Sequence, residues 1–334
     1  MNSKKVIIVL ALLVFFCGLL SGIGIRELFI SSKPVVFKAI REKGFKYTSP
    51  LLYYEGPEEN TDFVKQLTNR ITSYITNTSQ HGQAQNVSVY IRFPYLSDWT
   101  VINDNEKYSP ASLLKVPVMM VYLNQSQFNP TLLATTLTYN IADDNQKQNF
   151  KPQEQMVQGK SYSIEDLIKR MIVYSDDTAE DLLTMNINKQ DFDQIFDDIQ
   201  IDRLNYVNQE NSMDVKTYSY FFRVLYNATY LNRRISEQAL QLLTQTTFTQ
   251  GIVSGVPKNI IVAHKFGERA FADTGEKQLH DCGIVYYPKN PYILCVMTRG
   301  TSFANLETVL KNISAQVYTY TIQQSTAALN NNQN

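Results

Sequence analysis

Ser112 and Lys115 are the residues of this chain best suited to covalent chemistry. They follow Pro110 at the start of the apolar run 113–123, so the sequence predicts that both lie where a helix begins. Positions i and i+3 share one helix face, which lets a lysine amine reach a serine oxygen. Backbone N–H groups of a first turn lack helical partners and can stabilise an oxyanion. A helix-capping serine followed by a solvated lysine is the alternative interpretation.

Ser175, Asp176 and Asp177 form a second polar cluster. They stand between the segments 164–172 and 179–183, in which apolar residues recur at helical spacing. A short connection between helices can present such side chains to a cleft. Capping of a helix end explains the same composition equally well.

The third stretch comprises Lys265, Phe266, Gly267 and Glu268. It follows the apolar run 260–263, which predicts a strand. A glycine at this point allows a ligand to approach the backbone closely. A strand end with a solvated lysine is the alternative.

Together these stretches resemble the Ser-x-x-Lys, Ser-Asp-Asn and Lys-Thr-Gly motifs of class A β-lactamases and penicillin-binding proteins. The sequences YSPASLLKVPVMMVYL, YSDDTAEDLL and VAHKFGE are similar to the family's sequence around each motif. The resemblance covers roughly residues 48–326. It implies an α+β fold with an antiparallel sheet built from N- and C-terminal segments, flanked by helices, and a mainly helical second lobe.

The resemblance also implies a role for each matched residue. Ser112 would attack the substrate carbonyl and become acylated, and Lys115 would help to remove its proton. Ser175 would relay a proton to the leaving nitrogen. Lys265 would attract the substrate carboxylate and tune this relay. The backbone N–H groups of Ser112 and Glu268 would form the oxyanion hole.

Two residues depart from the family pattern. Asp177 replaces the asparagine that contacts the lysine and the substrate amide. An ionised carboxylate only accepts hydrogen bonds, and its charge favours the ammonium form of Lys115. Phe266 replaces a threonine or serine hydroxyl, so substrate binding beside Gly267 and Glu268 becomes more apolar and depends more on Lys265.

The deacylation machinery of the family has no clear match. Class A β-lactamases hydrolyse the acyl-enzyme with a loop glutamate followed by Leu-Asn. Glu210 is at a suitable distance from Asp177, but residues 211–214 do not match and the next helix is expected to begin at about Asp214. A solvated loop carboxylate is the preferred interpretation of Glu210. The sequence therefore supports forming an acyl-enzyme better than hydrolysing it.

The N-terminus reads MNSKK, followed by about 20 uncharged residues, which is the length of a membrane span. Lys4 and Lys5 favour a cytoplasmic N-terminus and an extracytoplasmic catalytic domain. A cleaved signal peptide and secretion are the alternative. The predicted segments are an anchor or signal at 1–25, a linker at 26–47, a catalytic domain at 48–326 and a disordered tail at 327–334.

Other features limit the partners. The 31 basic residues are balanced by 31 acidic ones, so no nucleic-acid footprint is present. His81, His264 and His280 lack metal-ligand spacing, and we expect neither a metal nor a cofactor. Cys282 and Cys295 are expected on neighbouring strands, where free thiols are favoured over a bond. The expected partner is a small β-lactam or a cell-wall peptide, bound by a monomer.

Strand patterns stand at both ends of the predicted domain, around a helical middle. This order predicts one antiparallel sheet assembled from distant segments. The expected helices are 61–78, one beginning at the nucleophile, several within 164–243, and 303–323; the expected strands are 87–93, 100–103, 260–265, 279–287 and 292–298.

Three functions are consistent with the sequence. The first is a serine hydrolase resembling class A β-lactamases. The second is a D,D-peptidase or penicillin-binding protein with slow deacylation. The third is a non-catalytic extracytoplasmic binding or sensor domain, suggested by Asp177 and Phe266. The presence of all four matched polar residues favours an enzyme; they are Ser112, Lys115, Ser175 and Lys265.

Overall fold

The computed structural model describes Phe15, Gly18 and residues 38–55, 61–96, 98–141, 145, 148–203, 212–288 and 290–331. The rest of the predicted anchor, the linker before Lys38, and Glu210 lie outside these residues. No helix among the described residues is long and apolar enough to cross a membrane. The chain divides into two units, Met1–Lys38 with Glu55–Pro57, and Ala39–Tyr54 with Glu58–Asn334. The second unit contains all three motifs.

A five-stranded antiparallel sheet with the strand order β4-β3-β9-β8-β7 forms the centre of the second unit. Its strands are β3 (Asn86–Phe93), β4 (Asp98–Ile102), β7 (Val262–Ala270), β8 (Lys277–Val285) and β9 (Tyr292–Gly300). β3 pairs directly with β9, with Val89 opposite Val296. Strands from the two ends of the domain therefore share one sheet, as the sequence predicts.

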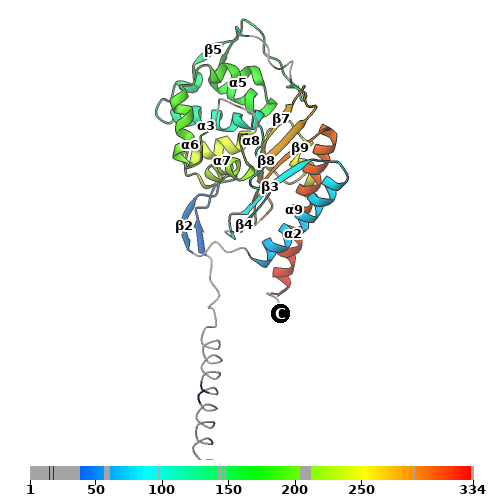
Figure 1. Cartoon of the computed structure of the whole chain (residues 1–334). Coiled ribbons are helices and arrows are strands. Elements are labelled where there is room, and N and C mark those ends of the chain that lie inside the picture. Colours follow the sequence, from blue (N-terminus) through cyan, green and yellow to red (C-terminus); the bar gives the residue numbers. More distant parts are fainter. Residues whose placement is uncertain are drawn as a thin grey trace, which may run out of the picture. The chain divides into compact units, whose positions relative to one another are not determined.

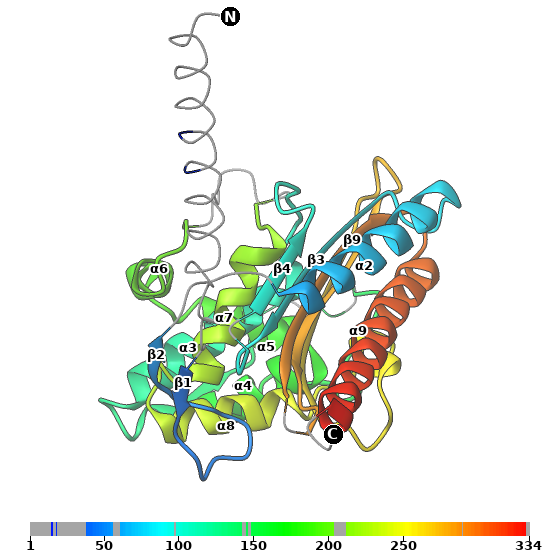
Figure 2. The same ribbon diagram turned by 90° about the horizontal axis from the view of Figure 1, so that it is seen from below.

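Two long helices, α2 (Asp62–Gln80) and α9 (Phe303–Asn331), cover one face of this sheet (Figures 1 and 2). α2 begins at Thr61, whose side chain accepts a hydrogen bond from the backbone of Val64. Its buried side chains recur every three or four residues and share an apolar core with those of α9. α9 continues to Asn331, beyond residue 326, the predicted end of the catalytic domain.

Helices form the second lobe on the other face of the sheet (Figure 1). α3 (Lys115–Ser126) is its most enclosed helix, with every residue from Lys115 to Leu123 buried. The other helices are α4 (Ile164–Lys169), α5 (Asp177–Thr184), α6 (Lys189–Asp198), α7 (Val215–Asn227) and α8 (Arg233–Leu243). The shorter elements of the unit are the 3-10 helices η1 (Ala111–Leu114), η2 (Leu132–Ala134) and η6 (Ile252–Gly255), the π-helix η4 (Arg170–Tyr174), and the paired strands β5 (Thr136–Thr138) and β6 (Ser161–Ser163).

The strands β1 (Lys38–Arg41) and β2 (Leu51–Glu55) form a separate two-stranded sheet. Arg41 donates hydrogen bonds to the backbone oxygens of Ser49 at 2.6 Å and Pro94 at 3.1 Å. Glu237 accepts hydrogen bonds from the backbone of residues 46–48. Residues 39–47, which the sequence analysis placed in the linker, therefore belong to the same unit as the catalytic motifs.

Cys282 and Cys295 face each other on the neighbouring strands β8 and β9. Both are buried and both are free thiols. The predicted strand neighbourhood and the preference for free thiols are confirmed.

Candidate active site

Ser112 lies in η1, immediately before α3, with 8% of its surface exposed. Lys115 is the first residue of α3, and its Nζ donates to the Oγ of Ser112 at 2.9 Å. The predicted contact between the two side chains is confirmed. The sequence predicted that both lie where a helix begins, and the structure shows that a 3-10 turn carries Ser112 into the helix.

The Lys115 ammonium has no exposed surface, so the protein must supply all of its partners. Its Nζ donates to the backbone oxygen of Ser175 at 2.7 Å and to the Oγ of Ser175 at 3.2 Å. It also forms a close ion pair with Asp177 and a longer one, 3.5 Å, with Oε2 of Glu180. Lys115 is thus held between the hydroxyl groups of Ser112 and Ser175 and two carboxylates.

Ser175 reaches the two lysines because the chain turns sharply at this residue. η4 ends at Tyr174, and Ser175 adopts the left-handed conformation, with a φ of 57°. This conformation costs a non-glycine residue roughly 1–2 kcal/mol, and such strain is common in active sites. Asp176 then caps α5 by accepting from the backbone of Ala179 at 3.1 Å. The capping interpretation holds for Asp176, while Ser175 points into the site.

Lys265 approaches the same hydroxyl from β7. Its Nζ donates to the Oγ of Ser175 and to the backbone oxygen of Phe266, each at 2.9 Å. Burial, reinforced by the charge of Lys115, holds the pKa of Lys265 well below its usual value. The Ser175 hydroxyl therefore lies between two lysines and can receive a proton from one while it donates its own elsewhere.

Gly267 allows β7 to pack directly against the nucleophile turn. A Cβ at this position would lie 2.8 Å from the backbone oxygen of Pro110 and 3.1 Å from the backbone nitrogen of Leu113. The sequence predicted that a ligand approaches the backbone here, whereas in the structure the group packed against Gly267 is the turn of η1. This packing brings β7 at Gly267 directly against the turn that carries Ser112.

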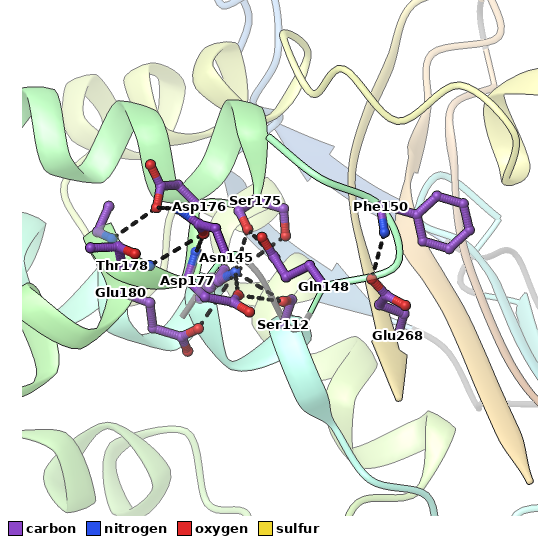
Figure 3. A network of polar contacts seen from close by, with 12 residues as sticks. Ser112, Asn145, Gln148, Phe150, Ser175, Asp176, Asp177, Thr178, Glu180 and Glu268 are labelled. Carbon is purple, nitrogen blue, oxygen red and sulfur yellow. Dashed lines mark hydrogen bonds and ion pairs between the residues drawn. The ribbon is translucent and has the colours of Figure 1, made fainter. Parts of the chain in front are cut away.

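The Glu268 side chain anchors a loop at the end of β7 (Figure 3). Its carboxylate accepts hydrogen bonds from the backbone of Asn149 at 2.7 Å and of Phe150 at 2.8 Å, and from the Asn149 amide at 2.6 Å. Burial raises the pKa of Glu268. The Glu268 side chain thus holds the loop of residues 149 and 150, and only the backbone of Glu268 is available to the site.

Phe266 is enclosed, with 4% of its surface exposed. Its ring stacks on Phe248 at a centroid distance of 4.1 Å, and Phe150 contacts both rings edge-on. The Lys265 ammonium lies 4.2 Å from the centroid of the Phe266 ring. An aromatic face, in place of a hydroxyl, therefore borders the lysine on this side.

Sequence reasoning missed two residues that hold the second motif in place. Asn145 accepts from the backbone of Asp177 at 2.8 Å and donates to the Asp176 carboxylate at 2.9 Å. Gln148 donates to the backbone oxygen of Ser175 at 2.7 Å. Figure 3 shows both side chains directed at residues 175–177. Both come from a polar loop about 30 residues upstream, where no local pattern distinguishes them.

Glu180 was also missed, although it had a signal. It follows Asp177 by three residues, which places both on one face of α5. Burial raises the pKa of Glu180 to about 7, an effect that the nearby charge of Lys115 partly offsets and that of Asp177 reinforces. With 21% of its side chain exposed, this carboxylate changes charge near neutral pH beside the candidate base.

The histidines lie outside this cluster in the part of the chain that the structure describes. His264 pairs with Asp281 at 2.8 Å, and Nε2 of His280 contacts the backbone oxygen of Ser109 at 3.0 Å. Burial lowers the pKa of His280 to about 3. The described residues include no group of three or more His, Cys, Asp and Glu that could hold a metal ion. A serine in contact with a potential base is the arrangement that nucleophilic catalysis uses.

Solved structures share this fold. A variant of PBP-A in an acyl-enzyme complex with penicillin G has a TM-score of 0.67 and 16% identity, covering 80% of this chain and 100% of that chain. A β-lactamase from Sphaerobacter thermophilus has a TM-score of 0.65 and 18% identity, covering 75% and 95%. A class A β-lactamase from Mycobacterium abscessus has a TM-score of 0.64 and 18% identity, covering 75% and 98%. These likenesses confirm the predicted fold.

A search of curated protein sequences finds no match for this chain. The profile of a family described as "Beta-lactamase enzyme family" matches residues 66–321. The match extends from α2 to α9 and includes the nucleophile turn, the Ser175 turn and the strand of Lys265. Because it spans well over half of the sequence, the chain belongs to the beta-lactamase enzyme family.

Proposed function

We propose that this protein is a serine hydrolase that opens β-lactam rings through an acyl-enzyme on Ser112. One observation carries the proposal: Lys115 donates to the Oγ of Ser112 at 2.9 Å, and the Oγ of Ser175 lies 3.2 Å from Lys115 and 2.9 Å from Lys265. A base is in contact with the nucleophile, and a proton path leads away from the base.

In the proposed acylation, the amine form of Lys115 takes the proton of Ser112 while Oγ bonds to the substrate carbonyl carbon. The backbone N–H groups of Ser112 and Glu268 stabilise the oxyanion. The C–N bond then breaks, and the nitrogen takes a proton from the Ser175 hydroxyl. Ser175 regains a proton from the Lys115 ammonium, which completes the proton balance.

Lys265 is proposed to attract the substrate carboxylate, because its Nζ borders the site from β7, 2.9 Å from the Oγ of Ser175. Asp177 has 29% of its side chain exposed, and as a carboxylate it can only accept hydrogen bonds. We therefore propose that it contacts an N–H group of the substrate side chain, where the family's asparagine also contacts a carbonyl.

Slow deacylation is the second candidate, and it would make the protein a D,D-peptidase or penicillin-binding protein. It is favoured by the early start of α7 at Val215, with Asp214 as its cap. Only 16 residues, 199–214, connect α6 to α7, and the helix begins next to Asp214, where the sequence predicts it.

We further propose that the catalytic unit acts outside the cytoplasm as a monomer anchored by residues 1–25. The proposal is supported by the uncharged N-terminal run and the lysines before it. Protease added to intact cells should digest the catalytic unit, and carbonate extraction should leave the chain in the membrane fraction. Protection from the protease would contradict this orientation.

The test of function is a fluorescent penicillin incubated with the full chain. We expect a covalent adduct that is lost in Ser112→Ala and retained in Ser126→Ala, a matched serine at the end of α3. A transient adduct with release of hydrolysed product supports the β-lactamase. A lasting adduct supports the penicillin-binding alternative. Absence of any Ser112-dependent adduct would refute both.

A further inference from the structure

Glu180 is the acidic group next to the nucleophile site for which the family motifs provide no role. It stands one helical turn after Asp177 on α5, and its Oε2 lies 3.5 Å from the Nζ of Lys115. Figure 3 shows the carboxylates of Asp177 and Glu180 on the same side of the site, with Ser112 beyond them. Two carboxylates from one helix thus face a single buried lysine.

Lys115 can serve as a base only after it has lost a proton. In the structure its ammonium donates to Ser112 and Ser175 and pairs closely with Asp177. A buried ammonium with these partners needs a nearby acceptor, because its side chain has no exposed surface from which water could take the proton.

The two carboxylates are not equivalent as acceptors. Asp177 forms the closer ion pair and also accepts from the Oγ of Ser112 at 3.5 Å, so its charge is used in positioning both groups. Glu180 makes the looser contact with Lys115, and burial raises its pKa to about 7. Glu180 is therefore the carboxylate that can hold a proton near neutral pH and return it.

We propose that Glu180 accepts the proton that Lys115 must lose before Lys115 can deprotonate Ser112. The proposal rests on the proposed function and deepens it. Glu180 acts on the reaction through Lys115, because it controls the protonation of the Lys115 amine. It is a positioning residue and does not contact the substrate.

The proton balance closes over one acylation. Lys115 first gives a proton to the Glu180 carboxylate and becomes an amine, which then takes the proton of Ser112 as the acyl bond forms. After Ser175 has protonated the leaving nitrogen, Lys115 restores the Ser175 hydroxyl. The carboxylic acid of Glu180 finally returns its proton to Lys115, so the cluster is unchanged and the Ser112 proton resides on the product nitrogen.

The charged groups that face Glu180 determine the pH dependence. They are Lys115 on α3, Asp177 and Asp181 on α5, and Lys265 on β7. Below about pH 7 Glu180 is protonated and cannot accept, so acylation slows. Above this pH it is ionised, and acylation reaches its plateau. The acylation rate is therefore expected to rise as the pH increases through about 7.

The experiment measures the acylation rate of the full chain by rapid mixing with a fluorescent penicillin, from about pH 5.5 to 8.5. For the wild type we expect an inflection near pH 7. Glu180→Gln should acylate about 100-fold more slowly at neutral pH and lose this inflection. Glu180→Asp should keep an inflection at a reduced rate, since it retains an ionisable group. Glu165→Gln, an exposed carboxylate on α4, is the matched control and should behave as the wild type.

The outcomes separate this proposal from the function on which it rests. A wild type that forms the Ser112 adduct, together with a Glu180→Gln variant of unchanged rate and pH profile, overturns the role of Glu180 alone. A wild type without any adduct overturns both. If Glu180→Gln does not fold, the wild-type profile decides, because a rate that stays flat across neutral pH also overturns the proposal.

Discussion

Replacing Gly267 by alanine tests whether the packing of β7 against η1 controls the reactivity of Ser112. The added Cβ would lie 2.8 Å from the backbone oxygen of Pro110 and 3.0 Å from Cγ of Leu113. Packed heavy atoms prefer about 3.5–4.0 Å, so the strand or the turn must move by roughly half an ångström or more. Overpacking of this kind costs about 1–3 kcal/mol, and misplacement by about 1 Å costs about 100-fold in rate.

We therefore expect Gly267→Ala to lower the melting temperature by roughly 2–10 °C and to slow acylation by about 10- to 100-fold. Thermal unfolding and rapid mixing with a fluorescent penicillin measure the two effects. Gly300→Ala is the matched control on β9, where the nearest neighbour of the added Cβ is the flexible Cδ2 of Leu306 at 3.1 Å. A folded Gly267→Ala protein that acylates at the wild-type rate would refute the reasoning, as would an equal slowing by Gly300→Ala.

Three further substitutions probe the polar cluster. Asp177→Asn supplies an amide donor for the substrate and removes one carboxylate from the surroundings of Lys115. We therefore expect acylation to be about 2- to 10-fold faster in rapid mixing. Slower acylation would contradict this expectation. Asn145→Ala leaves buried hydrogen-bonding groups of residues 176 and 177 without their partner, so the free energy of unfolding measured in urea should fall by about 1–3 kcal/mol. An unchanged free energy of unfolding would show that these hydrogen bonds do not stabilise the fold. Glu180 has its folded-state pKa raised from 4.5 to about 7, so its charge destabilises the fold increasingly as pH rises through this window. Relative to the wild type, Glu180→Gln should therefore gain about 2 kcal/mol of unfolding free energy between about pH 5 and pH 8, and a constant difference in urea unfolding would count against it.

Local patterns predicted much of this structure. The period of apolar residues predicted α2 and helices of the middle segment, because these helices bury one face. Short apolar runs predicted the central strands, which are buried along nearly their whole length. The i, i+3 spacing of Ser112 and Lys115 predicted their contact, since that spacing fixes a shared helix face. The Lys265 strand was predicted from its apolar run. At Gly267 a ligand was expected to approach the backbone, and the turn that carries Ser112 packs there instead.

Features that depend on tertiary packing could not be predicted in this way. Asn145 and Gln148 lie in a loop without periodicity, and only the fold brings them to the Ser175 turn. Arg41 belongs to a basic cluster that suggested a linker. In the structure its guanidinium donates to the side-chain oxygen of Asn227 at 3.0 Å, although the two residues are far apart in the sequence. For Glu180 the helix face could be predicted from spacing, but the raised pKa results from burial against elements distant in the sequence.

The pairing of β3 with β9 has a consequence for the order in which the chain can fold during synthesis. β3 is complete early, but one of its edges stays open until residues 292–300 have left the ribosome. Unpaired strand edges favour association with other chains, so the unfinished polypeptide passes through an aggregation-prone interval. Ser112 and Lys115 are also made well before Lys265. A nascent chain that ends before β7 therefore carries the contact between Ser112 and Lys115 without the second lysine, and the polar cluster becomes complete only after residues 262–270 have been made.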